Sequence, residues 1–383
     1  MMRSDKWLTG WVSTVFVLMV FIIGFVYYVD PLFHYHAPHT DRYHYELDNQ
    51  RYVNDGITRN FKYNALITGT SMTENFKTSE LDEVFGVKSV KIPYSGAAYK
   101  EVNDGIARAL RYNPDLKTVV RGIDMGYLFT DKDWMRDDLG TYPDYLYDNN
   151  LFNDVDYIFN QDTIFNRAYK MVLDSRQPDF EPGMISFDKY SSWQDQAVMG
   201  INKVSPDGIE VKKVQNESHV SDEELNRIRE NIKQNITDVA GQHPDVVFYC
   251  FFTPYSMVWW NEINNDGKVC EYVEAEKCAI EQMLNYDNIR LYSYNTRIDI
   301  TSDLNNYKDP THYGSWIDTL ILYWMHNGEG LITTDNYEKY ISDELRLHLD
   351  FDYASLNRQE DMDEDMIYGE NVLERELDRM SER

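Results

Sequence analysis

The sequence predicts an α/β fold in which a parallel sheet carries helices on both faces. From Phe61 onward, short apolar runs alternate with helical segments, and such alternation is typical of parallel strands joined by crossover helices. The run at 245–253 is nearly all apolar and lies between Pro244 and Pro254, which predicts a central strand. Strands are expected at 65–68, 89–93, 118–123, 245–253 and 289–294. Helices are expected at 79–85, 100–112, 221–240, 269–284 and 316–325.

The N-terminal segment predicts a membrane anchor. Arg3 and Lys6 precede 23 residues (7–29) without a charge, a length that spans about 30 Å of hydrocarbon. A cleaved signal peptide is the alternative, but the run ends in Tyr-Tyr-Val-Asp-Pro and offers no small-x-small cleavage site. Because the positive residues precede the helix, the N-terminus is expected in the cytoplasm and the rest of the chain outside.

The charge of the chain excludes one class of partner. The sequence holds 37 basic and 65 acidic residues, a formal net charge of −28. Such a surface repels phosphates, so nucleic acid is not an expected partner. Cys250 lies in an apolar run, and Cys270 and Cys278 are expected on one helix about 12 Å apart, too far for a disulfide. No cysteine–histidine spacing typical of a metal site is present, and no cofactor is expected.

Four regions are expected along the chain. Residues 1–29 form the cytoplasmic end and the anchor, and 30–60 form a juxtamembrane segment containing His34, His36, His39 and His44. A metal site there is conceivable, but the spacing matches no ligand template, and a polar, aromatic collar near the lipid headgroups is the simpler interpretation. Residues 61–330 form the α/β domain, with a large Asp-, Asn- and Tyr-rich insertion at about 127–215. Residues 331–383 form an acidic tail, of which 351–383 is expected to be a solvated helix or partly disordered.

A serine and a histidine stand at positions where an α/β fold could join them. Ser71 follows Gly69 directly after the first expected strand, at the edge where open α/β sheets bind their ligands. A serine hydroxyl becomes an effective nucleophile when a base removes its proton, and histidine suits that task near neutral pH. Asp309 and His312, three residues apart in Asp-Pro-Thr-His, can supply an orienting carboxylate and a base.

The same sheet edge offers candidates for an oxyanion site. Gly96 follows the second strand, where its N–H and the backbone N–H of Ser71 or Met72 could donate to a developing oxyanion. Simpler roles exist for each residue: Gly96 as a turn glycine, Asp309 as a helix N-cap and His312 as a polar surface residue. Their joint occurrence at the expected positions favours the catalytic interpretation.

These motifs resemble the SGNH (GDSL-like) hydrolase family. The matching pieces are Gly69-Thr70-Ser71 after the first strand, Gly96 after the second, and Asp-Pro-Thr-His at 309–312. The resemblance covers about 64–326 and leaves the insertion unmatched. It implies a flavodoxin-like three-layer sheet, Ser71 as nucleophile, Asp309 and His312 as orienting acid and base, and Gly96 as an oxyanion donor.

Two positions depart from the family pattern. Thr70 stands where the family has an aspartate before the serine, and Asp124 stands where the family has an asparagine that donates to the oxyanion. An ionised Asp124 would repel an oxyanion, so it cannot take the role of that asparagine unless it is protonated. Asp124 and Thr70 are expected instead to hold substrate or to orient a neighbour.

The anchor and the motifs together resemble cell-envelope members of this family. These act beside membrane-bound O-acyltransferases and include the D-alanylation protein of lipoteichoic acid synthesis and the alginate O-acetylation proteins. The resemblance implies an extracytoplasmic, single-pass serine esterase or O-acyltransferase acting on a cell-surface polysaccharide or teichoic acid through an acyl-Ser71 intermediate. Its expected partners are the bilayer, the glycan and a membrane-bound O-acyltransferase. The alternative is a non-catalytic envelope protein of the same fold that binds glycan or such a membrane partner, and a peptidase is a third interpretation.

Overall fold

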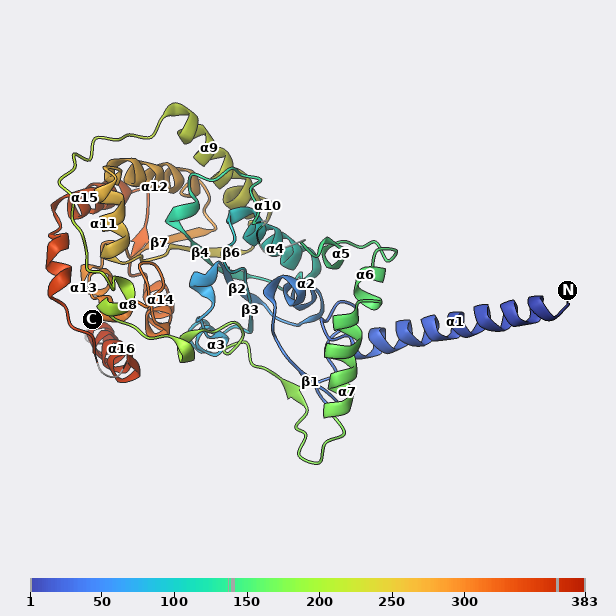
Figure 1. Ribbon diagram of the computed structural model, residues 1–383. Helices are drawn as coiled ribbons and strands as arrows, with labels where there is room; N and C mark the ends of the chain where they lie inside the picture. The colour runs from blue at the N-terminus through green and yellow to red at the C-terminus, as the bar shows by residue number, and fades with distance from the viewer. Residues whose placement is uncertain (1, 137, 139–141, 363–364, 382–383) are drawn as a thin grey trace. The chain divides into compact units, whose positions relative to one another are not determined.

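The computed structural model describes residues 2–136, 138, 142–362 and 365–381, and the chain forms two compact units. The first unit consists of Met1–Lys62 with Asp137–Ser186, and is called the juxtamembrane unit after the segment expected within it. The α/β unit consists of Tyr63–Arg136 with Phe187–Arg383. The chain therefore leaves the α/β unit after Arg136, completes the juxtamembrane unit, and returns at Phe187. Figure 1 labels the elements of both units.

The described part of the α/β unit contains one six-stranded sheet in the order β3-β2-β4-β6-β7-β8. Its strands are β2 (Ala65–Gly69), β3 (Ser89–Pro93), β4 (Thr118–Ile123), β6 (Val247–Phe252), β7 (Ile289–Ser293) and β8 (Leu331–Ile332). The first five are parallel and β8 is antiparallel to β7. These five strands lie within two residues of the expected bounds, and β6 is central as predicted. The α/β fold class is therefore confirmed.

Helices cover both faces of the sheet. The main ones are α3 (Thr78–Phe85), α4 (Tyr99–Tyr112), α9 (Asp222–Ile232), η5 (Lys233–Thr237), α10 (Asp238–Gln242), α11 (Met257–Asn265), α12 (Val269–Met283), α14 (Ser315–Asn327), α15 (Tyr337–Asp350) and α16 (Asp365–Ser381). Helix α14 packs with α3 and α16, whereas α12 packs with α9 and α15, and the two groups lie on opposite sides of the sheet (Figure 1). Short helical turns fill the connections: η1 (Ser71–Thr73), η2 (Met125–Tyr127), η4 (Gln194–Gln196), α8 (Ile201–Val204), α13 (Ile298–Thr301), η6 (Leu304–Asn306) and η7 (Tyr353–Arg358).

The acidic C-terminal region differs from the expected solvated tail. Strand β8 extends the sheet, α15 packs on α12, and α16 packs on α14. Tyr353, Leu356 and Val372 are almost completely buried, although few apolar residues surround them in the sequence. Because these few side chains fall on the packed sides of their helices, the described part of 331–383 belongs to the α/β unit.

The juxtamembrane unit begins with α1 (Met2–Val29), whose segment Lys6–Val29 is long and apolar enough to cross a membrane, with a mean hydropathy of 2.4. Its other elements are β1 (His44–Tyr45), α2 (Gln50–Asn60), α5 (Asp144–Tyr147), α6 (Val155–Ile158), η3 (Asp162–Tyr169), α7 (Lys170–Asp174) and β5 (Gly183–Met184). Strands β1 and β5 form a two-stranded parallel sheet, which joins the anchor segment to the later segment of this unit.

A buried carboxylate follows the last residue of α1. Asp30 has a positive φ of 42°, and its side chain accepts hydrogen bonds from the backbone N–H groups of His34, Tyr35 and His36 at 2.7–3.0 Å. It also accepts a 2.8 Å hydrogen bond from the hydroxyl of Tyr157 in α6. These bonds turn the chain sharply after α1 and fasten the turn to a segment more than a hundred residues later.

The insertion is predicted at about 127–215, and Asp137–Ser186 is the part of this range that belongs to the juxtamembrane unit. Residues after Phe187 contribute to the α/β unit through loop contacts, such as the 2.7 Å hydrogen bond from Ser315 N–H to the Gln194 side chain. Such contacts leave no periodic pattern in the sequence.

Candidate active site

The α/β unit brings Ser71, His312 and Asp309 together in one hydrogen-bonded chain. Ser71 Oγ lies 2.7 Å from His312 Nε2. His312 Nδ1 lies 2.8 and 2.9 Å from the two carboxylate oxygens of Asp309. All three side chains are partly exposed, so the chain of hydrogen bonds opens onto solvent. This is the order nucleophile, base and orienting acid that acyl transfer requires.

The end of β2 positions Ser71. Gly69 is the last residue of the strand, and a Cβ there would lie 2.6 Å from the Thr73 side chain, so the tight turn requires glycine. Ser71 then opens the single turn η1 at the carboxyl edge of the sheet. The segment beyond the turn is held by the buried side chain of Lys91 in β3, whose Nζ donates to the backbone carbonyls of Glu74 and Phe76 at 2.5 and 2.8 Å.

A compact loop presents Asp309 and His312. Asp309 Oδ1 accepts the backbone N–H groups of Thr311 and His312 at 3.0 and 2.9 Å. Burial would raise the pKa of Asp309, but the hydrogen bonds and charge of His312 outweigh it and hold the pKa of this carboxyl well below its usual value. Asp309 is therefore an ionised carboxylate facing the ring of His312. The N-cap of α14 is Gly314, so Asp309 does not have the capping role considered above.

Asp124 lies beneath the turn that carries Ser71. Its side chain accepts hydrogen bonds from Thr70 Oγ1 at 2.9 Å and from the hydroxyl of Tyr255 at 2.7 Å. Thr70 Oγ1 in turn accepts the backbone N–H of Met72 at 3.3 Å. Burial raises the pKa of Asp124, while the two hydroxyl donors lower it. Asp124 and Thr70 thus belong to one set of hydrogen bonds with the turn that carries Ser71.

Gly96 adopts the left-handed conformation that favours glycine, with a φ of +66°. In the described part of the chain, neither the N–H of Gly96 nor that of Ser71 donates a hydrogen bond, whereas the N–H of Met72 is engaged by Thr70. The geometry therefore favours Ser71 over Met72 as the second backbone donor of an oxyanion site.

A cavity of about 630 Å³ surrounds these residues. It is lined by Ser71, Gly96, Asp124 and His312 and also by two cations, Arg136 and Lys308. Arg136 lies against Gly96, because a Cβ on that glycine would come 1.9 Å from Arg136 Nη1. Two acids, Glu74 and Asp124, line the same cavity, so its charged lining is mixed.

Residues that no sequence motif indicated complete the site. The indole ring of Trp193 meets the ring of His312 edge to face at a centroid distance of 5.7 Å, and Lys308 Nζ lies 3.6 Å from the centre of the same indole. Trp193 and Arg136 come from the segments that flank the insertion. Their only signal in the sequence is that a large insertion at the carboxyl edge of a sheet often supplies site walls.

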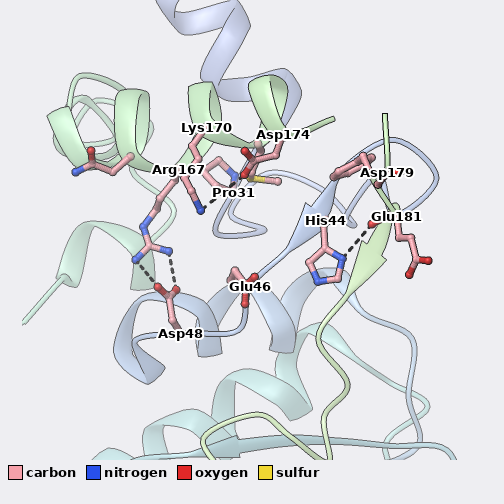
Figure 2. A pocket seen from close by; sticks show the side chains of 12 residues that line it. Pro31, His44, Glu46, Asp48, Arg167, Lys170, Asp174, Asp179 and Glu181 are labelled. Atoms are coloured by element: carbon pink, nitrogen blue, oxygen red, sulfur yellow. Dashed lines mark hydrogen bonds and ion pairs between the residues drawn. The ribbon is translucent and has the colours of Figure 1, made fainter. Parts of the chain in front are cut away.

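The juxtamembrane unit contains a second cavity of about 380 Å³, shown in Figure 2. Arg167 and Asp48 form a two-pronged ion pair at 2.7 and 3.2 Å on its wall, and His44 Nδ1 lies 3.3 Å from the carbonyl oxygen of Glu181. Among the described residues that line it there is no serine or cysteine to act with His44 as a nucleophile. The cavity around Ser71 is therefore the candidate active site.

Comparison with known proteins adds little. No protein-family model and no curated protein matches this sequence. A solved structure from Streptococcus pneumonia described as a "putative platelet activating factor" is similar to this chain at 10% identity, over 77% of this chain and 92% of its own, with a TM-score of 0.36. A likeness this remote carries no argument about fold or activity, which rest on the residues described above.

Proposed function

We propose that this protein is a membrane-anchored SGNH-type serine esterase or O-acyltransferase that acts on a cell-surface polysaccharide or teichoic acid. The observation that carries the proposal is the hydrogen-bonded chain from Ser71 through His312 to Asp309 at the carboxyl edge of a parallel sheet. Counted along the sheet, the five parallel strands follow the order 2-1-3-4-5, which is the flavodoxin-like order. This order supports the family assignment independently of the site residues.

In the proposed reaction, His312 Nε2 takes the proton of Ser71 Oγ while the oxygen attacks the carbonyl carbon of an acyl ester. The bond to the ester oxygen then breaks, the alcohol leaves with the proton from His312, and an acyl-Ser71 ester remains. In the second step water or a glycan hydroxyl gives its proton to His312 and attacks the carbonyl carbon of that ester. The bond to Ser71 Oγ then breaks, His312 returns the proton to Oγ, and the acyl group leaves as a carboxylic acid or as a glycan ester. Asp309 stabilises the charged imidazolium ring in both steps.

The oxyanion formed in each step needs hydrogen-bond donors. We assign this role to the N–H groups of Ser71 and Gly96 and to the guanidinium group of Arg136 beside Gly96. Arg136 would thereby take the place of the asparagine that the family resemblance leads one to expect at Asp124. Because Asp124 already accepts two hydroxyl hydrogen bonds beneath the turn, it is not a donor to the oxyanion.

The apolar helix supports an extracytoplasmic location. Helix α1 would cross the membrane with Arg3 and Lys6 on the cytoplasmic side, which would place the candidate site outside. A cell-surface glycan or teichoic acid suits this extracytoplasmic location.

Labelling with a fluorophosphonate, which reacts with activated serines, tests the proposal. We expect wild-type protein in detergent to form an adduct on Ser71, and we expect Ser71→Ala and His312→Ala to lose it. Ser95→Ala is the matched control: Ser95 lines the same cavity, but the hydrogen bond to His312 Nε2 belongs to Ser71, so the adduct should be unchanged. A folded wild-type protein that forms no adduct would favour the non-catalytic alternative, in which the same cavity only binds glycan.

A further inference from the structure

The second segment of the juxtamembrane unit exposes a patch of large apolar side chains. In the described part of the chain outside α1, seven exposed large apolar side chains fall within one stretch of 23 residues. Phe152 is 90% exposed and Leu151 is 75% exposed. The patch consists of Leu151, Phe152, Val155, Phe159, Phe165, Tyr169 and Leu173. A soluble surface rarely gathers so many large apolar residues in one stretch, so the patch indicates a binding surface.

Helical spacing places part of this patch on one face. Phe165, Tyr169 and Leu173 are four residues apart in η3 and α7, and all three are exposed. Thr163 and Ala168 lie on the buried side of the same helical run. Charged or polar residues such as Lys170 border the exposed face. The run is therefore amphipathic, but its apolar face points away from the core of the unit.

The helical run contacts the membrane anchor. Both α6 and η3 pack against α1. Figure 1 shows that α6, η3 and α7 run across the end of α1 that bears Val29 and do not continue along its axis. Tyr27 and Tyr28, which are exposed at this end of α1, occupy the level where interfacial aromatic residues of a spanning helix lie. A helix crossing α1 at this level would lie in the plane of the membrane surface.

We propose that the helical run of η3 and α7, residues 162–174, lies in the plane of the membrane with its exposed apolar face, Phe165, Tyr169 and Leu173, buried in the outer leaflet of the bilayer. The lipid is favoured over a second copy of the chain because the patch adjoins the apolar surface of α1, which only hydrocarbon can cover along its length. The inference requires that α1 spans the membrane, but it does not depend on the proposed enzymatic activity. It gives the juxtamembrane unit two attachments to the bilayer.

Fluorescence quenching in liposomes tests this assignment on the full-length chain. An environment-sensitive fluorophore would be attached to Phe165→Cys or Leu173→Cys in a Cys270→Ser background, because the other two native cysteines are buried. We expect doxyl groups near the top of the lipid acyl chains to quench both labels, and aqueous iodide to quench them poorly. A label at Val211→Cys, an exposed apolar position in the α/β unit, is the control and should show the opposite pattern.

Two results would overturn the proposal. Iodide quenching at Phe165→Cys equal to that at the control would show that the face lies in water. Protection from iodide without doxyl quenching would show that protein, such as a second copy, covers it. As a second variant, Phe165→Asp with Leu173→Asp should abolish doxyl quenching of a label at Tyr169→Cys. Because all three positions are exposed, this variant is expected to remain folded.

Discussion

The carboxylate of Asp124 is the clearest place to test how the turn carrying Ser71 is held. Thr70 and Tyr255 direct their hydroxyl groups at it, and all three residues are buried. A hydrogen bond to a charged acceptor contributes about 1.5–3 kcal/mol to stability, and a buried donor left without an acceptor costs a similar amount. The site therefore concentrates a large part of a typical free energy of unfolding in one side chain.

The substitution Asp124→Asn keeps the shape but leaves one acceptor oxygen for two hydroxyl groups. We expect the free energy of unfolding to fall by about 1.5–3 kcal/mol, and Asp124→Ala to cost roughly twice as much because both hydroxyls lose their acceptor. Urea unfolding followed by tryptophan fluorescence measures this, since six of the eight tryptophans belong to the α/β unit. The rate of fluorophosphonate labelling at Ser71 should fall by about tenfold or more, because Thr70 no longer fixes the turn.

Tyr255→Phe is the matched control for this prediction. It removes one donor to Asp124 but leaves the hydrogen bond from Thr70 in place, so stability should fall by about 1–2 kcal/mol with labelling close to wild type. The reasoning would be refuted if Asp124→Asn unfolded at the wild-type urea concentration and labelled at the wild-type rate. It would also be refuted if Tyr255→Phe slowed labelling as much as Asp124→Asn.

Three further predictions follow from the site. Asp309→Asn should slow the labelling of Ser71 by about 10³-fold or more while the protein stays folded by circular dichroism, because His312 loses the carboxylate that fixes its tautomer; near wild-type labelling would contradict this. Gly96→Ala should also slow labelling, because the new methyl group would displace Arg136. Gly86→Ala is the control for backbone strain alone, because Gly86 has the same left-handed conformation but no neighbour that a methyl group would meet. Burial lowers the pKa of Lys91 to about 8. The free energy of unfolding of the wild type should therefore rise by about 3 kcal/mol relative to Lys91→Met between about pH 8 and 10.5, because the unfolded chain binds a proton there that the folded chain does not. A difference in urea stability that stayed constant with pH would contradict this prediction.

The parts of the fold that could be predicted are those whose burial in the structure follows directly from a local residue pattern. The five parallel strands are short apolar runs between helical segments, and each could be located because both faces of a parallel sheet are buried. The positions of Ser71 and Gly96 followed from the same argument, since both come directly after a strand. Asp309 and His312 could be proposed as partners of Ser71 because their spacing allows one short loop to present both side chains.

Features that depend on distant contacts could not be predicted. Arg136 belongs to no motif, and its place beside Gly96 becomes visible only when the chain is folded. The segment 187–215 belongs to the α/β unit through loops and the short helical turns η4 and α8, which leave no long pattern in the sequence. The many acidic residues of the C-terminal region predict a solvated tail, whereas its packing in the structure depends on the few apolar side chains among them.

The division of the juxtamembrane unit into two chain segments constrains the order of folding. The turn after α1 is completed by the hydroxyl of Tyr157, which is synthesised long after Asp30. Strands β2, β3 and β4 lie between these two segments in the sequence. A ribosome adding about 5–20 residues per second would release those strands before the juxtamembrane unit could close. The juxtamembrane unit therefore cannot complete its fold until β2, β3 and β4 have been synthesised, because Asp30 has no hydrogen bond from Tyr157 before then.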